Sequence, residues 1–149
     1  MLRVQWVPYP IARLSLRPDP RNMHIRYSQS TGDLHLIEGE TSTLLGRGWA
    51  GRHEGKNKPD MDHLKNYGPL PRGWYRMGTP FKHPKVGQYS IRLHPLPETD
   101  MKVRDGFLIH GPSNSPKKFG HESEGCIIAY RVLREKIVST GAVRLEVVR

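Results

Sequence analysis

The chain has 149 residues, a length typical of one domain. Its mean hydropathy is -0.64, and it contains no apolar run near twenty residues, which excludes a membrane-spanning helix. The single cysteine, Cys126, excludes an intramolecular disulfide, a zinc site built on cysteines and a redox pair of cysteines.

The net charge is +10, and the Lys and Arg residues are spread along the whole chain. Such a charge attracts the phosphates of nucleic acids. The motifs of common DNA- and RNA-binding modules are nevertheless absent from the sequence. A basic nucleic-acid-binding module with a non-catalytic cysteine is therefore kept as the alternative to an enzyme.

Residues 1–22 differ from the rest of the chain in their closely spaced prolines. Pro8 and Pro10 interrupt the apolar stretch, which consequently lacks the continuous core of a signal peptide. We predict an N-terminal arm or linker over residues 1–22 and one domain over residues 23–149. Trp6 and Ile11 would also let this arm pack on the domain, and both arrangements stay open.

Strand-like segments dominate residues 23–149. Segments 24–29 and 33–38 flank a Gly-containing turn and predict a β-hairpin. The one expected helix covers residues 130–140, where Leu133 and Ile137 share an apolar stripe and Gly141 ends the pattern. Further strands are expected over residues 41–50, 74–78, 88–94 and 143–148. The order predicts a mainly β fold with one short helix.

Segment 88–94 alternates apolar side chains with Ser90, Arg92 and His94. This polar face either lines a functional site or meets water, because antiparallel sheets are commonly solvated on one face. Residues 51–67, in contrast, are polar throughout and predict a long, solvated surface loop.

Asp60, Asp62 and His63 within that loop suggest a metal site. A fourth converging ligand is missing from the neighbouring sequence. We therefore predict neither a metal nor a cofactor.

Residues 107–128 hold the side chains best suited to catalysis. The apolar residues 107–109 deliver His110 to the end of an expected strand, and Cys126 follows Gly125 sixteen positions later at a tight turn. An imidazole beside a thiol is the basis of thiol nucleophilic catalysis: it takes the proton, the thiolate attacks, and the imidazolium protonates the leaving group. A lone cysteine is also commonly a small buried hydrophobe, so residue chemistry alone leaves both interpretations open.

Four sequence blocks occur in a fixed order along the chain: residues 25–34, 66–75, 104–111 and 123–127. The last two, R-D-G-F-L-I-H-G and S-E-G-C-I, resemble the histidine and cysteine motifs of L,D-transpeptidase catalytic domains. All four together resemble the type VI secretion L,D-transpeptidase effectors, which attack bacterial cell walls. The resemblance covers about residues 24–149.

The resemblance implies an L,D-transpeptidase-like β-sandwich with one short helix after the catalytic cysteine. It implies a cysteine-dependent enzyme that acts on peptidoglycan stem peptides, as an L,D-carboxypeptidase, an L,D-transpeptidase or an enzyme of D-amino acid exchange. It further implies an antibacterial secreted effector that works in the bacterial periplasm or cell wall, with an immunity protein and a secretion-system component as partners. The anionic wall would attract so basic a protein.

Residue roles carry over as follows from the resemblance. Cys126 is the nucleophile, with its pKa lowered by a paired His110 imidazolium. Ser123, or a backbone carbonyl near it, would orient the imidazole, although Ser123 is equally suited to forming the turn. The turn with Glu124 and Gly125 would present backbone N–H groups to the oxyanion. The expected substrate-binding residues are Gly111, Arg104, His94 and Arg92.

Three positions depart from the family pattern. Glu124 stands where many L,D-transpeptidases have His, Ile128 where many have Arg, and Pro112 where the effectors commonly have an acidic residue. The second departure leaves open which cation would hold the carboxylate of the donor stem.

The segment between the two catalytic candidates, residues 111–122, is polar and carries two glycines and two prolines. We expect either a mobile rim of the active site or a rigid loop pinned by Phe119 and the prolines. Lys117 and Lys118 at its tip would meet an anionic substrate.

Overall fold

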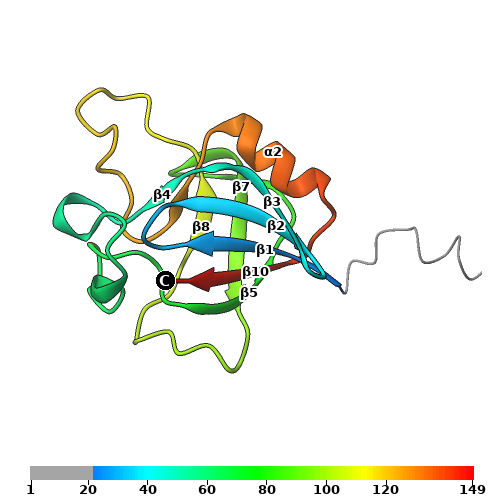
Figure 1. Cartoon of the computed structure of the whole chain (residues 1–149). Coiled ribbons are helices and arrows are strands. Elements are labelled where there is room, and N and C mark those ends of the chain that lie inside the picture. Colours follow the sequence, from blue (N-terminus) through cyan, green and yellow to red (C-terminus); the bar gives the residue numbers. More distant parts are fainter. Residues whose placement is uncertain (1–21) are drawn as a thin grey trace, which may run out of the picture.

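The computed structural model describes residues 22–149, so the arm predicted over residues 1–22 lies, apart from Asn22, outside the described residues. Within this range one α-helix and two short 3-10 helices accompany ten strands (Figure 1). The strands are β1 Met23–Ser28, β2 Asp33–Glu38, β3 Thr41–Arg47, β4 Trp49–Ala50, β5 Gly73–Met77, β6 Phe81–His83, β7 Gly87–Pro95, β8 Leu108–His110, β9 Ile127–Ile128 and β10 Arg144–Val148. The helices are η2 His53–Gly55, η3 Pro59–Met61 and α2 Arg131–Ser139.

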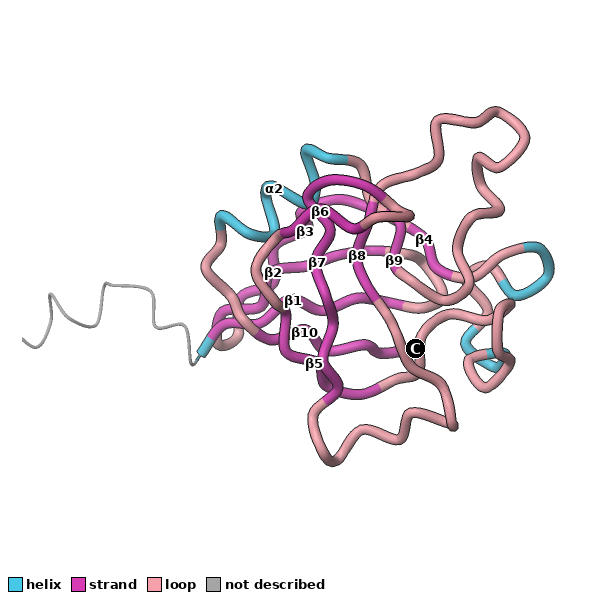
Figure 2. Tube along the Cα trace, turned by 180° about the vertical axis from the view of Figure 1, so that it is seen from behind, coloured by secondary structure: helices cyan, strands magenta, loops and turns pink. Residues whose placement is uncertain are grey.

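The strands form one continuous path in the order β3-β2-β1-β10-β5-β7-β8-β9-β4, with β6 paired to β7. The path folds over on itself, so β7 and β8 lie behind β1 and β10 in Figure 1 and in front of them in Figure 2. The pairs β1–β10 and β8–β9 are parallel, and the other neighbours are antiparallel.

The hydrophobic core lies between the two layers. Alternate residues of β1 and β10 point inward: Ile25 and Tyr27 of β1 and Leu145 and Val147 of β10 are buried. Burial of these apolar surfaces is the main force that holds the folded path together.

The predicted helix is confirmed as α2, and Leu133 and Ile137 of its apolar stripe are buried. Leu133 packs so closely on β3 that a Cβ at Gly46 would lie 3.0 Å from its Cδ1 atom. No helix among residues 22–149 is long and apolar enough to cross a bilayer.

The predicted hairpin is confirmed as β1 and β2, but the strand predicted over residues 41–50 is two strands, β3 and β4. The chain passes at Gly48 from one end of the sheet path to the other. The Gly48 N–H donates to Gly32 O at 2.9 Å, and a Cβ at Gly48 would collide with the Ile128 carbonyl. Strand β6 was not predicted, because its three residues lack a clear period.

The prediction of a solvated loop over residues 51–67 is wrong in its central part. The segment folds through η2 and η3, and Asp62 is only 2% exposed. The polarity of the sequence did not reveal that a carboxylate would be buried among hydrogen-bond donors.

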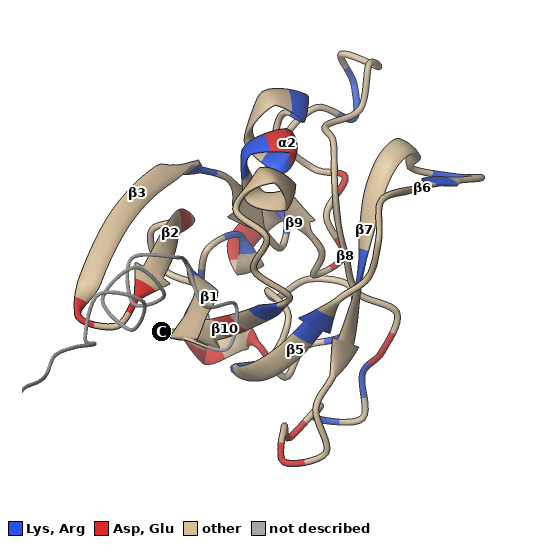
Figure 3. Ribbon diagram, turned by 90° about the vertical axis from the view of Figure 1, so that its right-hand side faces the viewer, with Lys and Arg blue, Asp and Glu red and all other residues tan. Residues whose placement is uncertain are grey.

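The basic residues lie on α2, β5, β6, β7 and several loops (Figure 3). In many nucleic-acid-binding domains the basic residues cluster on one face or along one helix. Here they are spread over several elements. The distribution matches a generally basic surface.

Candidate active site

The parallel pair β8–β9 brings the two catalytic candidates to one face of the sheet. Ile109 is in register with Ile127 and His110 with Ile128, so Cys126, just before β9, is level with Leu108. Ile109 and Ile127 point into the core. Because side chains alternate along strands, we expect His110 and Cys126 on the opposite face as diagonal neighbours, with Cys126 also packed against the edge of the core.

The thiol of Cys126 is held by the backbone of the adjacent strand. The Leu108 N–H donates to Sγ at 3.3 Å. Burial raises the pKa of the Cys126 thiol to about 11, Glu124 acts in the same direction, and this hydrogen bond, Arg92 and Arg104 oppose the shift. At neutral pH the thiol is therefore protonated in the free protein.

The imidazole of His110 is 4% exposed and oriented by its own backbone. Nδ1 lies 2.9 Å from Gly111 O, and a carbonyl only accepts, so Nδ1 carries the proton and Nε2 is left as the base. Burial lowers the pKa of His110, the Gly111 bond opposes this, and Arg134 lowers the pKa further. A neutral imidazole is favoured.

These two pKa shifts run against the expected thiolate–imidazolium pair. Both groups are neutral in the free protein because burial penalises the charged form of each. No hydrogen bond joins the two side chains among residues 22–149. Hydrogen bonds of catalytic groups often tighten only once substrate is bound.

The Ser123 hydroxyl organises the turn that carries the thiol. It donates to Cys126 O at 2.6 Å and accepts from Gly51 N at 2.9 Å and Gly125 N at 3.1 Å. The imidazole takes its orientation from the Gly111 carbonyl instead. Of the two roles considered for Ser123, these contacts favour the turn former over the partner of His110.

We expect Ser123→Ala to lower the free energy of unfolding by about 1–3 kcal/mol, because two buried N–H groups lose their acceptor. Urea unfolding of the full chain measures this loss. Ser139→Ala is the matched control, since the Ser139 hydroxyl is exposed and bonds only its own helix. Equal stability of the two variants would contradict the role given to Ser123.

Gly125 lets the turn approach a buried guanidinium. Its φ is +131°, and a Cβ would lie 2.6 Å from both Arg104 Nη2 and Phe107 Cε1. A side chain at this position would therefore push the turn away from Arg104.

Arg104, expected to bind substrate, lines the cleft at Cys126 and directs its guanidinium hydrogen bonds to the protein backbone. Its Nη1 donates to Asp62 O at 2.6 Å and Pro69 O at 2.7 Å. Its Nη2 donates to Gly68 O and Glu124 O, both at 3.0 Å. All four acceptors are backbone carbonyls, so the buried guanidinium clamps the protein itself.

Two clefts flank the catalytic candidates, and Glu124 lines both of them. The cleft at Cys126 has a volume of about 140 Å³ and includes Asn66 and Val103 on its wall. The cleft at His110 is larger, about 550 Å³, and its cations are Arg52, Lys85 and Lys118. Any of these three is a candidate for the cation that the family's arginine would supply.

The remaining predicted residues differ in their distance from the clefts. Gly111 lines the larger cleft, and a Cβ there would lie 2.7 Å from Nη2 of Arg134. Arg92 pairs with Leu108 across β7–β8, on the face of the thiol. His94 is exposed and lines neither cleft.

Sequence reasoning missed Arg134, which is 6% exposed and donates to Ala129 O, Gln88 O and Tyr89 O. The one sequence signal for its burial was its position three residues before Ile137, which places both on the same face of the expected helix. Among residues 22–149 no group of three or more His, Cys, Asp or Glu side chains could hold a metal ion.

The loop of residues 111–122 is tied at its base. The Glu122 carboxylate accepts from Ser113 N at 2.7 Å and Gly120 N at 2.8 Å. Phe119 packs edge-on against Trp49, with ring centroids 5.8 Å apart. These contacts support the pinned alternative, with Glu122 as an anchor that the sequence did not reveal.

Solved structures share this fold at low sequence identity. The helical cell shape determining protein Pgp2 from Campylobacter jejuni aligns with a TM-score of 0.56 and 18% identity over 84% of this chain and 46% of that chain. Bd1075 from Bdellovibrio bacteriovorus aligns with a TM-score of 0.55 and 16% identity over 85% of this chain and 48% of that chain. The chain thus spans about half the length of these two proteins.

An L,D-transpeptidase from Mycobacterium smegmatis aligns with a TM-score of 0.46 and 14% identity, over 86% of this chain and 59% of that chain. No curated protein sequence matches the chain. The predicted fold class, mainly β with one helix, is confirmed.

The sequence pattern of the Tlde1 domain matches residues 46–148. This range contains both catalytic candidates, His110 and Cys126. It also contains three of the four sequence blocks that suggested the resemblance. The chain therefore belongs to the Tlde1 domain family, the effector branch of the L,D-transpeptidases that its motifs resemble.

Proposed function

We propose that the protein is a cysteine-dependent enzyme of peptidoglycan that removes or exchanges the terminal D-alanine of peptide stems. The observation that carries the proposal is the register of the parallel pair β8–β9, which brings His110 and Cys126 onto neighbouring strands, each beside a cleft. Membership in the Tlde1 domain family supports peptidoglycan as the substrate.

In the proposed reaction, Nε2 of His110 takes the thiol proton as Sγ of Cys126 attacks the carbonyl of the third stem residue. The imidazolium then gives this proton to the amine of the departing D-alanine, and a thioester remains on Cys126. Water resolves the thioester in an L,D-carboxypeptidase reaction. A D-amino acid or the amine of a neighbouring stem resolves it in an exchange or transpeptidase reaction.

The tetrahedral oxyanion requires a hydrogen-bond donor close to the thiol. The Gly125 N–H is already bound to Ser123 Oγ. The Cys126 N–H has no acceptor in the described part of the chain, and we assign it as the oxyanion donor.

The basic side chains of the larger cleft suit the carboxylates of a peptide stem. Arg52, Lys85 and Lys118 line it together with only two carboxylates, Glu122 and Glu124. The Glu122 carboxylate is occupied by backbone N–H groups. The net charge of +10 would also favour the anionic cell wall.

The cellular role we propose is that of an antibacterial effector that acts in the periplasm or cell wall of a target bacterium. Family membership supports this role. A secretion-system component and a cognate immunity protein are the partners that such a role requires.

The proposal is tested with purified muropeptides that carry tetrapeptide stems, incubated with the wild-type chain and with Cys126→Ala. Mass spectrometry should find stems that lack one D-alanine, or stems with a replaced residue when a free D-amino acid is added. The Cys126→Ala variant should leave the stems unchanged. Intact stems after incubation with folded wild-type protein would contradict the proposed function, and tight DNA binding would then favour the nucleic-acid-binding alternative.

A further inference from the structure

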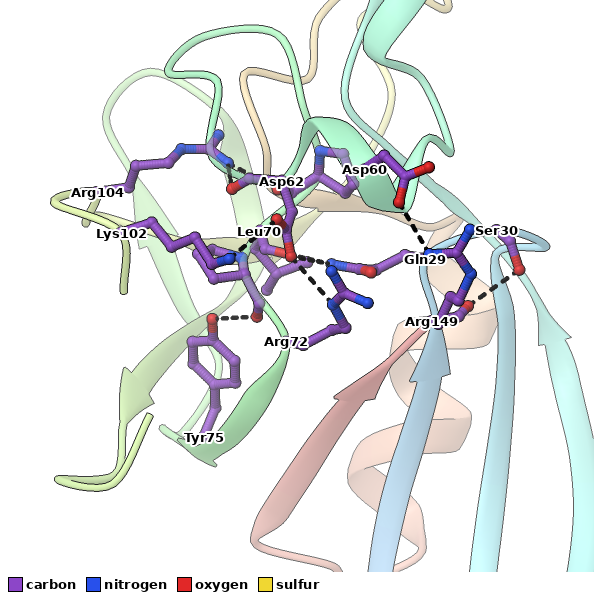
Figure 4. Close-up of polar contacts among 12 residues, drawn as sticks. Gln29, Ser30, Asp60, Asp62, Leu70, Arg72, Tyr75, Lys102, Arg104 and Arg149 are labelled. Carbon is purple, nitrogen blue, oxygen red and sulfur yellow. Dashed lines mark hydrogen bonds and ion pairs between the residues drawn. The ribbon is translucent and has the colours of Figure 1, made fainter. Parts of the chain in front are cut away.

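Residues 68–71, the G-P-L-P segment, are fixed by buried side chains through every one of their carbonyl groups. Figure 4 shows three of these side chains, Gln29, Tyr75 and Arg104, around Leu70. Arg104 donates to Gly68 O and Pro69 O at 3.0 and 2.7 Å. Gln29 Nε2 donates to Leu70 O at 2.9 Å, and the Tyr75 hydroxyl donates to Pro71 O at 2.7 Å. A segment held at four successive carbonyls has little freedom to shift.

Asp62 lies at the centre of these contacts. Its Oδ2 accepts from Gln29 Nε2 at 3.1 Å and from Arg72 Nε at 3.3 Å, and its Oδ1 lies 3.6 Å from Lys102 Nζ. Its backbone carbonyl accepts from Arg104. The Asp62 carboxylate thus holds Gln29, and the Asp62 backbone carbonyl holds Arg104; these two side chains fix residues 68–70.

The same segment is bonded to the turn that carries the nucleophile. The Leu70 N–H donates to Gly125 O at 3.0 Å, and Arg104 Nη2 donates to Glu124 O at 3.0 Å. A trans peptide unit is planar, with its C=O and N–H pointing in opposite directions. The bond from Leu70 to Gly125 O therefore turns the Cys126 N–H away from the buried segment.

We propose that Asp62 is a positioning residue for Cys126, which acts through Gln29, Arg104 and residues 68–70 to aim the Cys126 N–H. The inference rests on the proposed function, in which this N–H binds the oxyanion. Asp62 itself touches no substrate. Loss of the Asp62 carboxylate should reduce the stabilisation of the transition state and leave the affinity for substrate unchanged.

Asp62→Asn tests this role, because an amide has one acceptor oxygen and no negative charge. It cannot both accept from Gln29 and Arg72 and attract Lys102, so the contacts around residue 62 must rearrange. We expect kcat for stem cleavage to fall about tenfold or more with KM unchanged, since losing an oxyanion donor costs about 10²–10³-fold. Asp60→Asn is the matched control. Asp60 lies two residues away, its side chain is 79% exposed, and it pairs with Arg149 on the surface (Figure 4). It should keep the wild-type kcat.

A second measurement does not depend on substrate. Cys126 is the only cysteine, so protein labelled with 15N-cysteine gives one backbone amide signal, that of the Cys126 N–H. This signal should shift in Asp62→Asn and keep its wild-type position in Asp60→Asn. An unmoved signal in folded Asp62→Asn overturns the inference. A shifted signal combined with no cleavage by the wild type supports the inference and contradicts the proposed function.

If Asp62→Asn does not fold, the double variant Arg72→Gln/Lys102→Gln decides. Both side chains are partly exposed, 39% and 35%, and each contacts Asp62 from the solvent side. The variant should fold, shift the Cys126 signal and lower kcat by a smaller factor. A wild-type signal and a wild-type kcat in this variant overturn the inference.

Discussion

Replacing Cys126 with alanine is expected to lower kcat for stem cleavage on the order of 10⁴-fold or more, the scale at which catalytic nucleophiles are lost. The thiol forms the covalent bond to the stem, and no other described side chain beside the two clefts is a thiol. Product release from muropeptides, followed by mass spectrometry, measures the loss.

Cys126→Ser is the companion variant, because it keeps an acceptor for the Leu108 N–H that bonds Sγ in the wild type. A hydroxyl is a far weaker nucleophile near neutral pH, so this variant should be as inactive as Cys126→Ala. Thermal unfolding should show that both variants remain folded. Substantial cleavage by either folded variant would exclude the thiol mechanism.

Replacing His110 with alanine is expected to lower kcat by about 10²–10⁴-fold, the usual contribution of general acid–base catalysis. The thiol pKa of about 11 makes the base essential, since few thiolates exist at neutral pH without proton transfer. Steady-state kinetics on muropeptides measure the loss. His94→Ala is the matched control, because His94 lines neither cleft and should leave kcat unchanged.

The pH dependence follows from the same two groups. His110 must be neutral to act as a base, and burial lowers its pKa, so the acid limb of kcat/KM should lie below pH 6.5. Activity is present above this limb and is lost as the pH falls through it. An acid limb above pH 6.5 would contradict the buried, neutral imidazole.

The rate of alkylation by iodoacetamide measures the thiolate fraction of Cys126 directly. A pKa of about 11 means that the thiolate fraction, and with it the rate, rises about tenfold per pH unit from pH 7 to 10. A thiolate–imidazolium pair would instead give a rate that is already high and flat near neutral pH. The two profiles distinguish the thiolate–imidazolium pair expected from the sequence from the neutral pair that burial favours.

The sequence by itself determined most of the strand segments, the helix and the choice of two catalytic candidates. These features are local: a period-two pattern marks β1 and β2, and an apolar stripe marks α2. The order of four motifs also identified the family, because short motifs with fixed chemistry are readable without a structure.

Only the tertiary structure decided which residues position the two catalytic candidates and in which direction their pKa values shift. The burial of Asp62 and the clamp formed by Arg104 join residues 36 and 42 positions apart, and no local pattern encodes such contacts. The direction of both catalytic pKa shifts was likewise beyond the sequence. Burial sets each shift, and burial depends on which distant strands close over a side chain.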